Sequence, residues 1–488
     1  MPMKKQGKTT KKSTGHPPQK SSKATAPKKK IVSTKSSAKP KEKKLQSAPS
    51  TEQATTSSSS TKVKPVALLR GMKDILPQED MIWRTLMQTA GAITTAYNFL
   101  YTETPILEEA TLFVRSIGKG TDVVDKEMYM FEDNDGTKVA LRPEGTAGSA
   151  RAYIGHGMQS LPQPVNIWYF GPMFRHNRPQ AGRFREFHQF GCESFGVRDA
   201  AIDAELINVA YQYVADLGIA TRVEINSIGT LEDRTQYTVE LVSYLRTKRS
   251  YLCDLCKVRI NKNPLRVLDC NEPSCQPVKG EAPQIIDWLS ETSKKYFMDV
   301  LEYLDELHIP YTLNPLLVRG LDYYTDTVFE IYADQEEETA QSALAGGGRY
   351  DGLVEQLGGP ATPACGFSVG LERVASVLKA RTKEEPFAFS DGRTKLFFAQ
   401  LGTQASKRGL ALVEELRKSG LYLHHSFGKS SLKTQLELAN KIGVTHTLIL
   451  GQKEVLDGMI IIRDMESGIQ EIVDQRKIVS EVKKLVSV

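Results

Sequence analysis

The chain has 488 residues and a formal net charge of +6 at pH 7, and its composition is that of a soluble globular protein. This length exceeds what one ordinary hydrophobic core supports, so we expect two or three domains. The charge is unevenly distributed: residues 1–65 contain 17 lysines and two acids and carry +15, whereas residues 66–488 carry −9. The folded body is therefore expected to be mildly acidic, and the overall charge does not identify a binding surface.

Residues 1–65 consist mainly of Lys, Ser, Thr and Pro and contain few aliphatic side chains. Such a composition cannot bury enough apolar surface to offset the entropy of ordering, so a disordered basic tail is predicted. The stretch has neither the apolar segment of a secretory signal nor the arginines of a mitochondrial presequence. A mobile polycation is suited to sequence-independent RNA binding; a solvated tail without a partner is the alternative.

The composition also argues against a membrane protein and against a secreted one. Residues 85–102 carry no charge, but seven of these 18 residues are Thr, Gln or Asn, which predicts a soluble helix leading into a strand and no membrane span. Six cysteines without an export signal indicate a reducing compartment. We therefore expect a cytoplasmic protein without a disulfide framework.

Strand patterns outnumber helix patterns along the first part of the folded body. Several strands are joined by short turns, which favours an antiparallel sheet with flanking helices, an α+β class, over βαβ winding. The expected helices cover residues 79–98, 145–157, 201–218 and 370–381. The expected strands include residues 102–109, 128–133, 139–145, 165–175, 184–197, 222–229 and 317–331.

Two further segments differ in character from this sheet pattern. Residues from about 230 to 311 are helical and charged, contain four cysteines, and have the character of an insertion. The segment KEEPFAFSDGR has the charge, Pro and Gly content of a linker, and the residues after it alternate as β-α-β-α-β. We predict three parts: a tail at 1–65, a domain at 66–392 that contains the insertion, and a separate α/β domain at 393–488.

Two common nucleotide-binding signatures are incomplete in this chain. A P-loop ending in the GKS of residues 428–430 would need glycine where Leu423 stands, and a dinucleotide fingerprint beginning at the GKG of residues 118–120 would need glycine where Val123 stands. A nucleotide, if bound, would require another architecture.

Arginines provide the phosphate-binding candidates instead, because the planar guanidinium suits phosphate oxygens. One group lies in the loop between two expected strands: Arg175, Arg178, Arg183 and Arg185. Arg373 falls in the first turn of the helix that follows GFSVG, where a cation opposes the helix dipole. A polyphosphate bound at this helix start would explain it.

Polar faces on two strands indicate a small-molecule site. In the strand after the arginine loop, alternation places on one face Arg185, Phe187, Gln189, Gly191 and Glu193. In LVRGLDYYTDTVFEI (317–331), alternation places on one face Tyr324, Asp326, Val328 and Glu330. We expect residues 319–324 to carry chemistry and residues 328–331 to hold the strand in the sheet.

Two other clusters have both a functional and a structural interpretation. Glu144 and Thr146 lie at a strand-to-helix turn, where they suit a helix cap or a ligand amine. The insertion cysteines have the pattern C-x2-C-x13-C-x4-C: Cys253, Cys256, Cys270 and Cys275. This spacing is close to that of a structural zinc site, although the last gap is wider than usual. Zinc binding and four unliganded thiols remain open alternatives.

Taken in order, six peptides make the chain from about residue 66 to its end resemble the histidyl-tRNA synthetase family of class II aminoacyl-tRNA synthetases. RGMKDILP, TETPILEEATLF, FRHNRPQAGRFREFHQFGCE and GFSVGLERV resemble the family's opening and its three class motifs. LVRGLDYY and AGGGRYDGL resemble two peptides specific to the histidine enzymes. The resemblance implies an antiparallel class II catalytic core, a C-terminal α/β anticodon-binding domain and a homodimer built through the first class motif.

The resemblance also implies residue roles. Arg175 would hold the α-phosphate of ATP, and Arg373 would reach the γ-phosphate and stack on adenine opposite Phe187. Arg319 would contact the histidine carboxylate and the α-phosphate. The histidine-binding residues would be Glu144 and Thr146 at the amino group, Gln189 beside it, Glu193 and Tyr324 at the imidazole nitrogens, and Tyr350 nearby.

These residues imply histidine activation by ATP with Mg²⁺, followed by transfer to tRNA(His). The arginine loop would lie by the tRNA acceptor end, with Arg183 as the candidate for reading the extra 5′ guanosine. A structural zinc ion is not a general feature of the family. A non-catalytic paralogue, such as the regulatory subunit of ATP phosphoribosyltransferase, is the alternative from another class; a synthetase for another amino acid conflicts with Glu193 and Tyr324.

Overall fold

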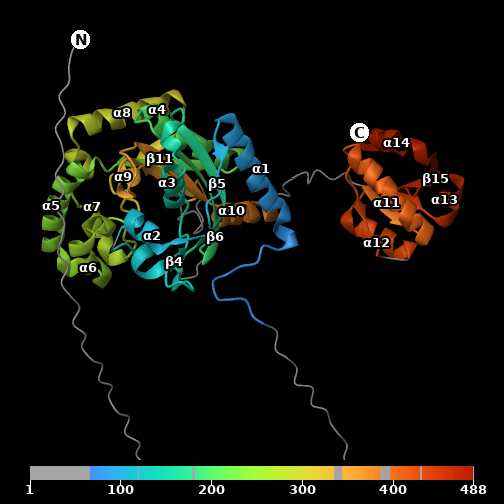
Figure 1. Cartoon of the computed structure of the whole chain (residues 1–488), viewed down its shortest axis with the longest axis horizontal. Coiled ribbons are helices and arrows are strands. Elements are labelled where there is room, and N and C mark those ends of the chain that lie inside the picture. The colour runs from blue at the N-terminus through green and yellow to red at the C-terminus, as the bar shows by residue number, and fades with distance from the viewer. Residues whose placement is uncertain are drawn as a thin grey trace, which may run out of the picture. The chain divides into compact units, whose positions relative to one another are not determined.

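The computed structural model describes six stretches of the chain (Figure 1): residues 66–118, 120–178, 182–334, 343–384, 396–428 and 431–486. The predicted basic tail and most of the predicted linker lie outside these residues. The described residues form two bodies, one up to residue 384 and one from residue 396, and each is treated by itself. Among the helices in these ranges, none has the length and apolar character needed to cross a membrane.

An eight-stranded sheet forms the centre of the first body. Only its terminal pairs, β1 with β5 and β7 with β8, are parallel, and the pairs between them are antiparallel. The predicted antiparallel α+β core is therefore confirmed. In spatial order the strands are β1 (Leu100–Tyr101), β5 (Val165–Phe174), β6 (Glu186–Phe195), β11 (Ala364–Gly370), β10 (Ala345–Arg349), β9 (Thr325–Ala333), β7 (Thr221–Ser227) and β8 (Tyr311–Leu313).

One face of this sheet is covered by helices and forms the main hydrophobic core. The strand side chains that point into it include Phe190, Cys192, Phe329, Ile331 and Phe367. The covering helices are α1 (Asp80–Ala96), α4 (Ala200–Asp216), α8 (Glu291–Glu306) and α10 (Leu371–Glu384). Figure 1 shows α4 and α8 side by side. The opposite face of the sheet carries polar residues together with part of a second hydrophobic cluster, which includes Ile167, Phe195 and Val328.

A smaller sheet and three helices border that polar face. The strands, in the order β2-β4-β3, are β2 (Leu107–Glu109), β4 (Lys138–Leu141) and β3 (Met130–Glu132). The helices are α2 (Ala110–Ile117), α3 (Thr146–Gly155) and α9 (Leu353–Gln356). Ala110, Phe113, Ile117, Ala140 and Ala147 form a hydrophobic cluster between these elements. The cluster places the N-terminus of α3 directly beside the main sheet.

The segment expected to be an insertion is helical. It contains α5 (Leu231–Thr247), α6 (Asp254–Lys262) and α7 (Gln276–Gly280), and it ends with α8. Asp233 joins the start of α5 to that of α8, because its carboxylate accepts hydrogen bonds from Thr230 N, Ser290 N and Ser293 Oγ. Helices α5 to α7 pack in a second hydrophobic cluster together with Tyr323 and Tyr324.

The second body contains a five-stranded sheet. Its strands, in spatial order, are β13 (His424–His425), β12 (Leu396–Gln400), β14 (His446–Leu450), β15 (Met459–Asp464) and β16 (Gln470–Asp474). The first three strands are parallel and agree with the predicted alternation. The hairpin of β15 and β16 is antiparallel and was not predicted. The helices are α11 (Thr403–Lys418), α12 (Leu432–Ile442), α13 (Gln452–Asp457) and α14 (Ile478–Val486).

Candidate active site

The polar face of the main sheet is built from matched glycines and polar residues on neighbouring strands. One row across the strands reads Tyr169, Gly191, Ser368, Gly346 and Glu330. The adjacent row reads Ile167, Glu193, Gly366, Gly348 and Val328. The glycines leave space above the sheet that side chains from other strands occupy.

Two of these glycines show how the space is used. A Cβ added at Gly366 would overlap Glu193 Oε2, and one added at Gly346 would overlap the guanidinium of Arg319. Both side chains therefore lie flat across a strand that offers no side chain of its own. The polar face of β6, which alternation predicts to carry Gln189, Gly191 and Glu193, is confirmed by the burial of Phe190 and Cys192 in the core on the other side.

Glu193 is fully buried at the centre of this face and accepts hydrogen bonds from three hydroxyl groups. Thr146 Oγ1 donates to Oε1 over 2.7 Å and Tyr169 Oη donates to the same oxygen over 3.3 Å. Tyr350 Oη donates to Oε2. Burial raises the pKa of Glu193 to about 8, although the three hydroxyls act in the opposite direction. The carboxyl group can therefore gain or lose a proton near neutral pH.

Glu144 lies beside Glu193 at the start of α3. Its carboxylate accepts hydrogen bonds from Thr146 N over 2.6 Å and from Ala147 N over 3.0 Å. The helix-cap interpretation is therefore realised in the structure. Burial raises the pKa of Glu144, and the charge of Arg175 partly offsets this effect. Because Thr146 also donates to Glu193, its hydroxyl and backbone link the two buried acids.

Three tyrosines form one wall next to Glu193. The ring centroids of Tyr323 and Tyr324 lie 4.7 Å apart, and those of Tyr324 and Tyr350 lie 6.3 Å apart. Tyr324 does not share a strand face with Asp326 as predicted, because β9 begins at Thr325 and Asp326 has a left-handed φ of 46°. Alternation on this strand starts only after Asp326, whose carboxylate pairs with Arg198.

Arg319 lies between this wall and Glu330. Its guanidinium lies over the ring of Tyr324, 5.5 Å from the centroid, and forms an ion pair with Glu330. Among the described residues, no partner contacts its buried Nε. Burial alone would lower the pKa of Arg319, but the charge of Glu330 raises it, so the group stays a cation.

Glu330 was not predicted as a site residue, because residues 328–331 were expected only to hold the strand. Its register opposite Gly346 points it onto the polar face. Alternation had placed Glu330 on the same face as Tyr324 and Asp326, and an acid on that face was the signal that could have identified it.

Arg175, Phe187 and Arg373 are the other residues expected to bind ATP. Arg175 Nε donates to the carbonyl oxygen of Pro143 over 2.8 Å, and its guanidinium lies 5.4 Å from the ring centroid of Phe187. Arg373 is in the first turn of α10, as predicted, and donates to the carbonyl oxygen of Ala343.

The arginines are close enough to affect one another electrostatically. Burial, together with the positive charges of Arg183, Arg175 and Arg319, lowers the pKa of Arg373 to about 10. Glu330 acts in the opposite direction. Three guanidinium groups thus lie near enough to act on Arg373, and the acids that act on this group are Glu330 at Arg373 and Glu127 and Glu144 at Arg175. An excess of cations of this kind favours a polyanionic ligand.

Gln189 and Glu372 are two further polar residues near Glu193 and Arg373. Gln189 Nε2 donates to Ser368 Oγ over 3.2 Å, and within the described residues its buried Oε1 has no hydrogen-bond partner. Glu372, beside Arg373, accepts hydrogen bonds from His188 N and Nδ1 and so fixes α10 against β6. No local pattern predicts this last contact, because 184 residues separate its partners.

Some arginines singled out in the sequence lie apart from this group. Arg178 is exposed, and the guanidinium of Arg185 makes a long contact, 3.5 Å, from Nε to the carbonyl oxygen of Asn177. Arg349 is fully buried and pairs with Asp203 and Asp351, so it stabilises the fold beside Tyr350.

Comparisons with known proteins show the family of the chain. The sequence model of the family "Histidyl-tRNA synthetase" matches residues 71–233 and 282–374, and that of the "Anticodon binding domain" matches residues 396–485. A histidine--tRNA ligase of Dehalococcoides mccartyi is 44% identical over 416 residues, which cover 85% of this chain and 98% of the relative. That of Aquifex aeolicus is 44% identical over 403 residues, covering 82% and 97%.

Solved structures agree as well. The crystal structure of apo S. aureus histidyl-tRNA synthetase has a TM-score of 0.70 at 34% identity and covers 86% of this chain and 100% of its own. The first body thus has the catalytic fold of a class II aminoacyl-tRNA synthetase. Together with the family matches, the site shows that the chain belongs to the histidyl-tRNA synthetase family. A protein titled as an ATP phosphoribosyltransferase regulatory subunit/histidyl-tRNA synthetase, from Bacillus halodurans C, shares the fold at 18% identity and a TM-score of 0.57.

Proposed function

We propose that the protein is a histidine–tRNA ligase that joins L-histidine to tRNA(His) through histidyl-adenylate. The observation that carries this proposal is the buried Glu193 with its three hydroxyl donors, next to the converging arginines. Glu193 and its hydroxyl donors suit an imidazole, which both donates and accepts hydrogen bonds. The arginines suit a triphosphate. Their adjacency suits a reaction between the two ligands.

The first step needs charge stabilisation and no protein nucleophile. A carboxylate oxygen of histidine attacks the α-phosphorus of ATP, and the bond from that phosphorus to the bridging oxygen breaks, so pyrophosphate leaves with the electron pair. Arg319 is proposed to contact both the carboxylate and the α-phosphate, and Arg175 the α-phosphate. The free Nε of Arg319 and its position between Tyr324 and the other arginines support this role.

ATP is proposed to bind along the remaining arginines as its Mg²⁺ complex, in which the ion is held by the phosphates. Arg373 would reach the γ-phosphate. Arg175 lies at the ring of Phe187, which leaves the other face of that ring for adenine. Mg²⁺ is the metal ion that adenylate formation from ATP requires. A zinc ion at the insertion cysteines would have a structural role instead.

Histidine is proposed to bind with its imidazole between Glu193 and Tyr324, near Tyr350. Its amino group would lie near Glu144, Thr146 and Gln189, where the unsatisfied Oε1 of Gln189 supplies an acceptor. Buried polar groups that lose their partners reject an apolar amino acid of similar size strongly. The same arrangement therefore supports both binding and selection.

In the second step a ribose hydroxyl at the 3′ end of tRNA attacks the carbonyl carbon of the adenylate, AMP leaves, and the hydroxyl proton is lost. Residues 393–488 are proposed to contact the anticodon, and residues 66–392 to catalyse both steps. Arg183 is exposed beside Arg373 and is the proposed contact for the acceptor end.

A homodimer is proposed as the working form. Exposed apolar side chains lie on β1, β2 and β3 and in the peptide that resembles the first class motif: Leu100, Tyr101, Ile106, Leu107, Met130 and Phe131. Exposed apolar groups gathered on short strands suit an interface between copies of the chain. A cytoplasmic location is proposed because all six cysteines are free thiols.

The experiment that tests the activity is ATP–pyrophosphate exchange with each amino acid in turn, followed by aminoacylation of a tRNA(His) transcript. Exchange with histidine alone is expected. Exchange with proline or threonine but not histidine would overturn the substrate assignment, and absence of exchange with every amino acid would favour the non-catalytic alternative.

A further inference from the structure

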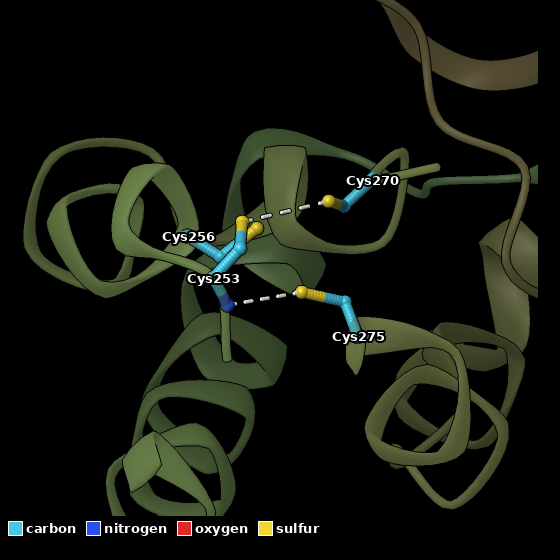
Figure 2. A group of neighbouring side chains, drawn as sticks. All are labelled: Cys253, Cys256, Cys270 and Cys275. Atoms are coloured by element: carbon cyan, nitrogen blue, oxygen red, sulfur yellow. Dashed lines mark hydrogen bonds between the residues drawn. The ribbon is translucent and has the colours of Figure 1, made fainter. Parts of the chain in front are cut away.

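The four insertion cysteines lie close together in the helical segment between β7 and β8. Their sulfur atoms all lie within 4.8 Å of one another. Figure 2 shows the four side chains directed toward one another from separate short elements. Cys253 and Cys256 stand at the start of α6, Cys270 follows a short 3₁₀ turn, and Cys275 precedes α7. We call this group the cysteine cluster.

The spacing of the sulfur atoms suits a single tetrahedral ion. With Zn–S bonds of about 2.3 Å, the thiolates of a regular tetrahedron lie about 3.8 Å apart. Cys253 Sγ and Cys270 Sγ lie 3.9 Å apart. This separation is too long for a disulfide, and all four cysteines are free. In a cluster of two or four irons the four thiolates are shared among separate iron atoms and do not all bind one ion.

Local hydrogen bonds and a helix start lie next to the sulfur atoms of the cysteine cluster. Cys253 N donates to Cys275 Sγ over 3.3 Å, a bond that stabilises a negative sulfur (Figure 2). Cys253 and Cys256 lie at the N-terminus of α6, where the helix dipole has the same effect. Lys279 Nζ and Gln276 Nε2 both donate to the carbonyl oxygen of Cys270 and hold its loop. Three of the four side chains are buried, so an ion here would be shielded from solvent.

The cysteine cluster also closes a loop that contacts the candidate active site. Asn263, between Cys256 and Cys270, donates through Nδ2 to Asp322 Oδ1 over 2.8 Å. Arg266 in the same loop lies against Gly320, close enough that a Cβ there would come within 3.0 Å of its Nη1. Asp322 and Gly320 belong to the peptide 319–324, which carries Arg319 and Tyr324.

A hydrophobic cluster continues this connection. It contains Cys256, Val267, Cys270 and Cys275 together with Tyr323 and Tyr324. The helices that carry the cysteines, α6 and α7, are short, with nine and five residues. Such short helices have little core of their own, so a metal cross-link would add substantially to the stability of the segment.

We propose that the cysteine cluster binds one Zn²⁺ through four thiolates and that this ion holds residues 263–270 against the peptide 319–324. On binding, Zn²⁺ displaces the proton of each thiol, so four protons are released per ion when all four start protonated. The site is structural, because four protein ligands leave no open coordination position. It is not carried over from the family match, whose residues stop at 233 and resume at 282.

Metal content of the full-length, untagged protein tests the ion directly. Inductively coupled plasma mass spectrometry should find about one zinc per chain, and Cys256→Ser and Cys275→Ser should each lose most of it. Cys192→Ala is the matched control, because Cys192 is a buried cysteine of β6 outside the cysteine cluster, and it should keep its zinc. Folded protein that contains no zinc overturns the proposal, and so does iron with visible charge-transfer absorption.

The connection to the peptide 319–324 is tested on the wild-type protein, so it does not depend on variants that fail to fold. Removing zinc with a chelator should lower the melting temperature and increase amide hydrogen exchange in residues 263–270 and 317–324. Adding back Zn²⁺ should restore both, and Mg²⁺ should not. If zinc leaves while exchange at 317–324 stays unchanged, the proposed contact with the active site is wrong. These readouts are independent of enzymatic activity.

Discussion

The candidate active site has a region around Glu193 that is proposed to bind histidine, the histidine side, and a region around Arg373 that is proposed to bind phosphates, the phosphate side. The two differ in how their polar groups are satisfied. Around Glu193 the groups already bond one another: three hydroxyls donate to the carboxyl, and Glu144 caps α3. Around Arg373 lie three further guanidinium groups, and the acids that act on them are Glu330 at Arg373 and Glu127 and Glu144 at Arg175. The first region is preorganised, so a ligand there would replace existing hydrogen bonds, whereas the second region holds several cations that an anionic ligand would balance.

Arg319 belongs to both regions, and its replacement is expected to have the largest effect. Arg319→Ala should lower the rate of histidine-dependent ATP–pyrophosphate exchange about 100- to 1000-fold, the range found when one group that stabilises the transition state is removed. The dissociation constant for histidine, measured by calorimetry, should change much less.

Arg84→Ala is the matched control for this prediction, because Arg84 is an exposed arginine of the same body and pairs only with Asp80 on its own helix. It should retain wild-type exchange. An Arg319→Ala variant with undiminished exchange would remove the proposed contact with the α-phosphate.

Glu193→Gln should affect the histidine side alone. The amide keeps the shape of the side chain, but it has one oxygen that can accept a hydrogen bond where the carboxylate has two. We therefore expect kcat/KM for histidine to fall about 100-fold, while KM for ATP stays within a factor of about two or three. Exchange kinetics with each substrate varied in turn make the measurement. Glu240→Gln, an exposed acid on α5, serves as the control, and an equal rise in both KM values would contradict the separation of the two regions.

The sequence anticipated the contents of each region better than the contacts between them. Alternation identified the polar face of β6, and the position of Arg373 at a helix start indicated an anion site, because both are local patterns. The pairing of Arg319 with Glu330 and the donation from Tyr169 to Glu193 depend on register. Register sets Tyr169 opposite Gly191 and Glu330 opposite Gly346, and no local pattern encodes which glycine faces which side chain. The roles assigned to the site residues stay predictions.

Arg373→Ala is expected to weaken the phosphate side by a smaller amount, because Arg175, Arg183 and Arg319 remain. KM for ATP in the exchange assay should rise about tenfold, since one charge-assisted contact is lost from several. KM for histidine should not change. A histidine KM that rises as much as that for ATP would mean that the cations and the histidine pocket act as one unit.

The smallest expected effect is a pH dependence of stability that comes from the histidine side. Glu193 has a pKa of about 8 in the folded protein, compared with about 4.3 for an unperturbed Glu. Between these values the folded protein holds a proton that the unfolded chain has lost, so stability decreases as pH rises toward 8 and levels off above it. Glu144, whose pKa is also raised, acts in the same direction. In melting experiments from pH 6 to 9 without ligands, Glu193→Gln should reduce the slope of melting temperature against pH, because an amide does not titrate. An identical slope in wild type and variant would show that the buried carboxyl is already ionised at pH 6 and that the pocket is set up to receive an imidazolium.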